Sequence, residues 1–270
     1  MRLVLWPAVA ACCLAATVQR PDANEIVRRS VQAIEADWAQ APHYSFVERD
    51  AESKHDSRPV IKTYEVLMID GSQYGRVIAV NDQPLSGGEQ ADEERKLRAE
   101  TAKREHESER ERAKRIAKYE KERTQDHALL NAMVDAFDFR LVGEEKINGH
   151  DCWVLDATPK RGYQPKNRET KVLTGMAGKL WVDKNEYQWV KVSAEVTKPV
   201  SLYGFVAKVG PGTRFLLEQE PVADNLWLPK HFSVHVSASA LGFINENSTD
   251  DETYGNYKPI IASTAKLSRP

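Results

Sequence analysis

The segment GKLWVDKNEYQWVKVSAEV, residues 178–196, predicts two β-strands joined by a polar turn at Lys184 and Asn185. Apolar and polar side chains alternate along the second strand, and alternate residues of a strand point to opposite faces of its sheet. One face should therefore carry Val190, Val192, Ala194 and Val196, and the other face Trp189, Lys191, Ser193 and Glu195. Such an apolar face covers a packed core, a bound apolar molecule or another protein.

Alternation of the same kind recurs on both sides of this hairpin. Strands are predicted at 43–50, 62–71, 72–82, 139–144, 151–158, 202–208, 213–218, 227–238 and 254–261, and a turn is predicted at 245–251. The pairs Asp70-Gly71 and Asn148-Gly149 favour two-residue hairpin turns. Because only two helical segments accompany these strands, the pattern predicts a mainly β (α+β) protein. We expect one antiparallel sheet, curved or partly closed into an open barrel, with helices packed against it.

The first helix is predicted over residues 22–41, where apolar side chains recur with the period of one helix face. Asp22 or Asn24 is available to cap its N-terminus. The apolar stripe consists of Ile26, Val27, Val31, Ile34 and Trp38. An amphipathic helix of this kind needs an apolar surface to cover, and the sheet is the surface expected.

A second helical segment, at about 88–136, is rich in charged residues. Between Glu89 and Asp126 it holds twelve acidic and twelve basic residues and no Pro or Gly, which is a helix-forming composition. Opposite charges four residues apart support one long helix: Asp92 with Lys96, Glu94 with Arg98, Glu100 with Arg104, and Glu111 with Arg115. Its surface is either solvated or an arm that binds a protein partner. Its last part should dock on the sheet through Leu129, Leu130, Met133, Val134 and Phe137.

The N-terminus has the layout of a secretory signal peptide, with Arg2 followed by an uncharged run from Leu3 to Val18. We expect residues 1–16 to be this signal peptide and 17–270 to form a single domain. A second interpretation is that Cys12, which follows the residues Val-Ala-Ala, is acylated as in bacterial lipoproteins. Under either interpretation we expect the protein to be periplasmic or otherwise exported. It would also associate with a membrane if Cys12 is acylated.

Charge and motifs argue against several classes of function. The chain has 38 basic and 40 acidic residues, so its net charge of −2 offers no general attraction to nucleic acid. His231 and His235 lie on one predicted strand, where they are about 13 Å apart and too distant to bind one metal ion. Phosphate-binding, nucleophile-elbow and zinc-protease motifs are absent from the sequence. We therefore expect no enzyme activity, catalytic residue, metal or cofactor. Cys152 is predicted to be a small, half-buried apolar residue.

Several strands repeat the apolar alternation of the 178–196 hairpin. If the sheet closed completely, this surface would be an ordinary core; if it stayed half open, the same surface would line a cavity for acyl chains. Each candidate for that cavity is also a candidate for plain core packing. The candidates are Trp153, Trp181, Val190, Val192, Phe215, Leu217, Trp227 and Phe232.

Two short motifs carry a resemblance to a known family. The pattern G-K-L-W-V-D-K-x5-V-K-V-S-A-E, from Gly178 to Glu195, is followed by L-W-L-P-K, from Leu226 to Lys230. Together with the signal peptide, the first helix and the strand meander, they resemble the periplasmic lipoprotein-carrier superfamily of LolA, LolB and RseB. The resemblance covers about residues 22–262 in the order of elements. It implies a half-open antiparallel β-barrel whose concave apolar face, covered by helices, binds lipoprotein acyl chains.

Two functions follow as hypotheses. The first is a non-catalytic, exported carrier that binds a lipid or the acyl chain of a lipoprotein by burying its CH₂ groups, each contributing about 0.8 kcal/mol. The second is an envelope sensor or scaffold that uses the charged helix, a helical insertion at about 88–136, to bind a protein partner. Deleting residues 89–126 should separate the two, because only the scaffold needs that helix.

Overall fold

The computed structural model describes residues 21–55, 57–167, 169–202, 207–240, 244–245 and 247–260. The expected signal peptide at 1–16 and the acylation candidate Cys12 lie outside these residues. Among the helices of the described ranges, none has the length and apolar character needed to cross a membrane.

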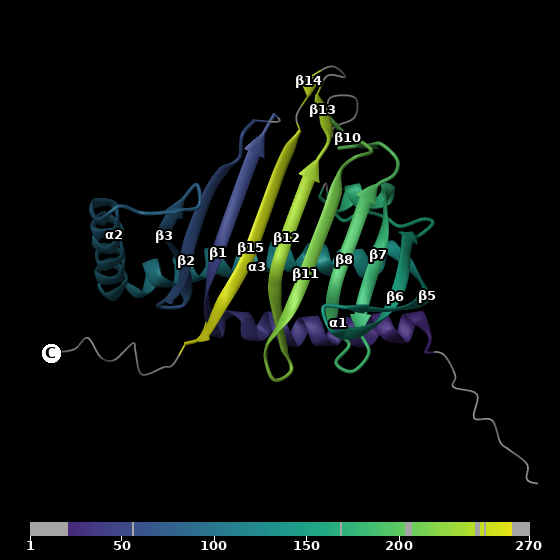
Figure 1. The fold of residues 1–270 in the computed structure, drawn as a ribbon, viewed down its shortest axis with the longest axis horizontal. Coiled ribbons are helices and arrows are strands. Elements are labelled where there is room, and N and C mark those ends of the chain that lie inside the picture. The colour runs from purple at the N-terminus through teal and green to yellow at the C-terminus, as the bar shows by residue number, and fades with distance from the viewer. Residues whose placement is uncertain are drawn as a thin grey trace, which may run out of the picture.

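An open antiparallel sheet forms most of the molecule (Figure 1). The strands are β1 (Tyr44–Lys54), β2 (Val60–Ile69), β3 (Ser72–Val80), β4 (Gln83–Pro84), β5 (Phe137–Ile147), β6 (His150–Pro159), β7 (Met176–Asp183), β8 (Trp189–Val196), β11 (Arg214–Ala223), β12 (Leu226–Val236) and β15 (Ser248–Pro259). Their order is β4-β3-β2-β1-β15-β12-β11-β8-β7-β6-β5. The predicted antiparallel α+β class is confirmed. The sheet is not closed, because β4 and β5 lie at its two ends.

A second, smaller sheet lies beyond the C-terminal end of β12 (Figure 1). It has the order β14-β13-β10-β9 and consists of β9 (Val200–Ser201), β10 (Ala207–Val209), β13 (Ala238–Ala240) and β14 (Ile244–Asn245). The strand predicted at 202–208 falls partly on residues outside the described ranges.

Two helices pack on one face of the large sheet. They are α1 (Ala23–Gln40) and α3 (Glu109–Ala136), and both cross the strand direction (Figure 1). The predicted first helix is confirmed, although the side chains it buries are Ile26, Val27, Ser30, Ile34 and Asp37. Val31 and Trp38, predicted for the same stripe, are only partly buried. Short 3₁₀ helices occupy Ala41–His43 and Glu169–Gly175.

The prediction of a single long charged helix at about 88–136 is wrong, because the segment forms two helices. These are α2 (Gly87–Glu105) and α3, with His106, Glu107 and Ser108 between them. Ser108 begins a new helix there: its hydroxyl accepts from Glu111 N at 3.3 Å, and the Glu111 carboxylate accepts from Ser108 N at 3.0 Å. An equal capping box, Ser86 with Glu89, begins α2.

The two charged helices make some of the predicted ion pairs. Arg98 lies 3.6 Å from Glu94, and Arg104 lies 2.8 Å from Glu100, both four residues apart as predicted. The predicted pair of Arg115 with Glu111 is wrong. Arg115 instead contacts Glu107 at 2.7 Å, since Glu111 is engaged in capping.

Two predicted hairpin turns are confirmed by backbone geometry. Asp70 and Gly71 have φ of 44° and 87°, and Asn148 and Gly149 have φ of 51° and 90°. Positive φ at both central residues is the hallmark of the two-residue hairpin turn that suits the twist of the strands. The predicted turn at 245–251 is partly wrong, since β15 already begins at Ser248. Its Thr-Asp-Asp-Glu sequence resembles a turn, but neighbouring strands on both sides supply its hydrogen-bond partners.

Candidate apolar binding site

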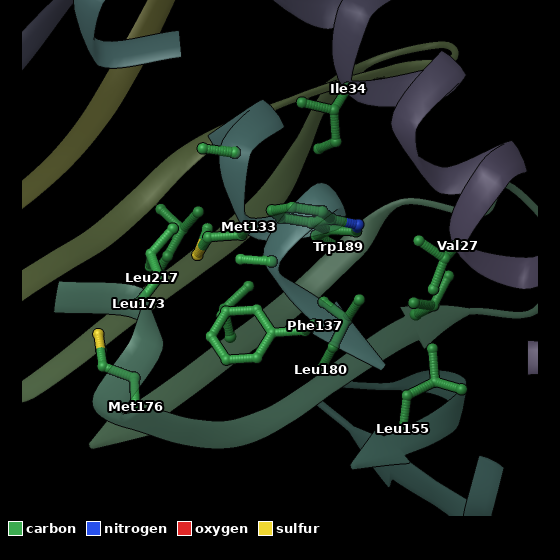
Figure 2. Packing of buried hydrophobic residues seen from close by; sticks show 14 of the residues in the cluster. Val27, Ile34, Met133, Phe137, Leu155, Leu173, Met176, Leu180, Trp189 and Leu217 are labelled. Atoms are coloured by element: carbon green, nitrogen blue, oxygen red, sulfur yellow. The ribbon is translucent and has the colours of Figure 1, made fainter. Parts of the chain in front are cut away.

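The main core lies between α1, α3 and one half of the sheet. Figure 2 shows Met133 and Phe137 at the end of α3 close to Leu180 and Trp189 of the sheet. Leu155 is fully buried, and Leu180 and Trp189 are each 3% exposed. The buried members are Ile26, Val27, Ile34, Ala132, Met133, Ala136, Phe137, Trp153, Leu155, Leu173, Met176, Leu180, Val182, Trp189, Val192, Val196, Val209 and Leu217. The helices therefore cover the apolar face of β5 to β8 and β11.

A β-bulge changes which side chains of β8 face the helices. The pairing of β7 with β8 shifts between Trp181 with Lys191 and Val182 with Trp189, so Val190 is the extra residue. Trp189 therefore points to the same side as Val192, into the main core, while Val190 belongs to a second cluster. The predicted common face of Val190 and Val192 is wrong for this reason.

The eight candidate residues divide between two clusters. Trp153, Val192 and Leu217 are buried in the main core, and Phe215 and Phe232 pack against it partly buried. The remaining three, Trp181, Val190 and Trp227, lie with Cys152 in the second cluster. Alternation along β6 and β7 places Cys152 and Trp181 on the sheet face opposite the helices. Contact of any of the eight with a ligand stays a prediction.

A small cavity lies where the end of α3 meets the sheet. Met133 and Val134 line it from α3, Phe137 lines it from the first position of β5, and its volume is about 30 Å³. A water molecule needs about 10–15 Å³ on this measure, so the cavity is far too small for an acyl chain. The sheet side is lined by Phe139, Ala157, Gly178, Lys179, Leu180, Trp189, Val192, Ser193 and Ala194. Side chains of α1 and α3 thus fill most of the space over the apolar face.

Small residues form the floor of this cavity. Ala157 of β6 lies opposite Gly178 of β7, which lies opposite Ala194 of β8. A Cβ at Gly178 would lie 2.4 Å from the carbonyl oxygen of Ser193, so this position accepts only glycine without a backbone shift. The floor of the cavity therefore consists of backbone and methyl groups.

The apolar face ends at β12. Phe232 pairs with Glu252 of β15, which pairs with Asp50 of β1, and directly paired residues share a face. Five carboxylates gather on that part of the face: Glu48, Asp50, Glu52, Asp250 and Glu252. Burial, followed by the charge of Asp50, raises the pKa of both Glu48 and Asp250. A ligand made of hydrocarbon therefore fits the β5 to β11 half of the face only.

Sequence reasoning missed this acidic patch, although alternation signals it in Glu48-x-Asp50-x-Glu52 and Asp250-x-Glu252. Across the described ranges, no three His, Cys, Asp or Glu side chains are placed to hold a metal ion.

Polar contacts join the two helices above the core. The His127 imidazole lies 2.9 Å from the Glu35 carboxylate and stacks on Trp38 with ring centroids 4.7 Å apart. Asn131 donates to Glu35 at 3.0 Å, and Arg123 donates to the carbonyl oxygen of Trp38 at 2.6 Å. Polar groups thus join the middle of α3 to α1, and apolar contacts hold the C-terminal end of α3 on the sheet.

No family model matches the chain, and no curated protein matches it. Solved structures align with most of it. A DUF1329 family protein from Desulfovibrio piger aligns with 90% of this chain and 95% of its own, at 14% identity and a TM-score of 0.30. A LolA superfamily protein from Nitrosomonas europaea aligns with 92% of this chain and 98% of its own, at 13% identity and a TM-score of 0.31.

A structure of the Pseudomonas aeruginosa MucA/MucB complex aligns with 90% of this chain and 100% of its own, at 13% identity and a TM-score of 0.22. The LolA superfamily is among these neighbours. Similarity at this level identifies neither a ligand nor a partner of the chain.

The remaining chemical candidates have ordinary structural surroundings. Cys152 is fully buried, and burial raises the pKa of its thiol to about 11, which keeps it protonated near neutral pH. His231 lies 3.0 Å from Asp251, and His235 lies 2.9 Å from the hydroxyl of Thr249, so the two histidines have separate partners on β15.

Proposed function

We propose that this chain is an exported, non-catalytic protein that binds an apolar ligand, a lipid or the acyl chain of a lipoprotein, between its sheet and the end of α3. The support is the cavity beneath Met133, Val134 and Phe137, whose floor is the small-residue row Ala157, Gly178 and Ala194. In this proposal the sheet acts as the wall of a half-open barrel, and α1 and α3 cover its concave side.

Loading requires the end of α3 to move away from the sheet, because the cavity holds only about 30 Å³. Exposing the buried side chains of Met133 and Phe137 would cost about 1.5–3 kcal/mol each, and exposing the partly buried Val134 would cost less. An acyl chain contributes about 0.8 kcal/mol per buried CH₂, so a chain of about twelve CH₂ groups offsets that cost. The exchange needs no nucleotide or other energy source.

Filling the cavity should abolish ligand uptake. We expect Ala157→Leu to weaken binding of cis-parinaric acid, a fluorescent fatty acid, at least tenfold, because the larger side chain occupies the floor of the cavity. Ala177→Leu is the matched control, since Ala177 lies one position from Gly178 and so points to the opposite face of the sheet. Titration of probe fluorescence, with thermal unfolding to check that each variant is folded, measures the effect.

Equal binding by Ala157→Leu, Ala177→Leu and the unmodified protein would refute this location of the site. If Ala157→Leu fails to fold, Val134→Trp fills the same cavity from the helix side. Absence of parinaric acid binding by the unmodified protein would refute the proposed function.

A second candidate function is an envelope sensor or scaffold that binds a protein through α2. The observation that favours it is the exposed charged surface of α2, where the side chains of Arg95 and Arg98 are 68% and 70% exposed. The helix bearing them is held firmly on the protein by Arg104, which is 4% exposed. A rigid, exposed and charged helix is a suitable binding surface for a partner.

Charge reversal on α2 separates the two functions. We expect the double variant Arg95→Glu and Arg98→Glu to keep parinaric acid binding within twofold if the protein is a carrier. A scaffold should instead lose the partner that co-purifies from its own cell envelope. Deleting 89–126 is a poorer test, because it also removes Arg104 and Arg115, which fasten the helices to the sheet.

A further inference from the structure

α1 presents one acidic side chain to the sheet. Asp37 is 3% exposed and lies on the helix face that buries Ile26, Ser30 and Ile34. Its Oδ1 accepts a hydrogen bond from Trp227 N at 3.3 Å, but its Oδ2 has no hydrogen-bond partner among the described residues. A buried carboxylate oxygen without a donor opposes the seating of the helix.

Gln188 lies at the same junction. Its side chain is also 3% exposed and contacts the Asp37 carboxyl group, and its Oε1 lacks a hydrogen-bond donor within the described part of the chain. Two contacting side chains thus each leave one acceptor oxygen unsatisfied. A proton on Asp37 would turn Oδ2 into a donor, which could satisfy Gln188 Oε1 as well.

The charges around Asp37 favour that proton. Glu186, in the turn before β8, is the charged residue that acts on Asp37, and it is negative. The neighbouring side chains are neutral: Trp227 in β12 and Gln188 just before β8. On α3, Arg123 and His127 contact Trp38 and Glu35 instead. Burial raises the pKa of Asp37 to about 7 with a small contribution from Glu186, and it outweighs the opposing hydrogen bonds from the Trp227 backbone and the Gln188 side chain.

We propose that Asp37 is a proton-operated latch: the C-terminal half of α1 stays seated on the sheet while this carboxyl group is protonated, and separates from Trp227 and Gln188 when the proton passes to solvent. The buried Asp37 carboxyl group with its unsatisfied oxygen favours this movement of α1 whatever ligand the protein binds. Its use to open the apolar site rests on the proposed function.

The direction of the pH dependence follows from the two states. The pKa is about 7 when α1 is seated and returns to the ordinary value of 3.8 when the carboxyl group reaches water. An acid whose pKa is raised in the seated state favours seating when protonated. Seating is therefore strongest below about pH 3.8, weakens steadily up to about pH 7, and changes little above that.

Hydrogen exchange of the α1 amides tests the latch. We expect protection of residues 31–40, corrected for intrinsic exchange rates, to fall on the order of tenfold between about pH 5.5 and about pH 8 in the unmodified protein. Asp37→Asn, which keeps the shape and removes the titration, should show no such fall. Glu25→Gln is the control, because Glu25 is an exposed carboxylate of the same helix and should leave the fall unchanged.

A flat profile in the unmodified protein, or the same fall in Asp37→Asn, would overturn the latch. If Asp37→Asn fails to fold, the carbon NMR titration of Asp37 in the unmodified protein decides, and a pKa below about 5 would overturn it. The proposed function is tested separately, by parinaric acid binding at one pH. A pH-dependent α1 in a protein that binds no parinaric acid would keep the latch and refute the carrier.

Discussion

Arg104→Ala is expected to cost about 3–5 kcal/mol in the attachment of α2 and α3 to the sheet. The Arg104 guanidinium is buried against the β2–β3 turn and donates to the carbonyl oxygens of Ile69 at 2.8 Å and Ser72 at 2.9 Å. It also donates to Gln73 O at 3.3 Å and pairs with Glu100 at 2.8 Å. Alanine would leave those acceptors and one carboxylate without their donor, and this unpaired state is what makes the loss large.

Urea unfolding and hydrogen exchange of α2 measure this loss, because the helices can detach before the sheet unfolds. Arg98→Ala is the matched control, since its side chain is 70% exposed and its single ion pair at 3.6 Å should contribute less than about 1 kcal/mol. We expect Arg104→Lys to recover little, because an ammonium group cannot reach several carbonyl oxygens in the way the planar guanidinium does. Equal exchange rates of α2 in Arg104→Ala and Arg98→Ala would contradict the prediction.

The β2–β3 turn that Arg104 contacts was predictable from the sequence, whereas the role of Arg104 was not. Asp70-Gly71 forms a hairpin turn through local backbone preferences that the dipeptide itself carries. The contact between Arg104 and the carbonyl oxygen of Ile69 joins residues 35 positions apart, and nothing local marks this arginine among twelve basic residues. The available signal was weak: Leu97, Glu100 and Arg104 recur on one helix face, which is the less exposed face of α2.

The residues of the candidate site were likewise only partly predictable from the sequence. The alternation in β6, β7 and β11 placed Trp153 and Leu217 in the main core as the pattern indicates. A single bulge residue, Val190, changes the faces of Trp189 and Val190 at the start of β8, and alternation alone cannot locate a bulge. The extent of the apolar face was also beyond the local pattern, because the order β12-β15-β1 brings together strands far apart in the sequence and sets carboxylates beside Phe232.

Trp189→Ala should destabilise the whole domain by about 3–5 kcal/mol. Because of the bulge, the Trp189 indole is 3% exposed between sheet and helices, and its Nε1 donates to the Ser30 hydroxyl of α1 at 2.8 Å. Its loss removes a large apolar side chain from the main core and a hydrogen bond between the sheet and α1. Trp181→Ala is the matched control, since Trp181 is partly exposed on the opposite face, and it should cost much less.

A double-mutant cycle separates the hydrogen bond from the packing of Trp189. Trp189→Phe keeps most of the apolar contact, and Ser30→Ala removes the acceptor, so their coupling energy should be about 1 kcal/mol. The Ser30 hydroxyl still donates to Val27 O at 2.9 Å in Trp189→Phe, which keeps that variant free of an unsatisfied donor. Urea unfolding of the four proteins gives the coupling. If Trp181→Ala proved as damaging as Trp189→Ala, the bulge would not set the faces of β8 as described, and the apolar site beneath α3 would have to include Val190 instead.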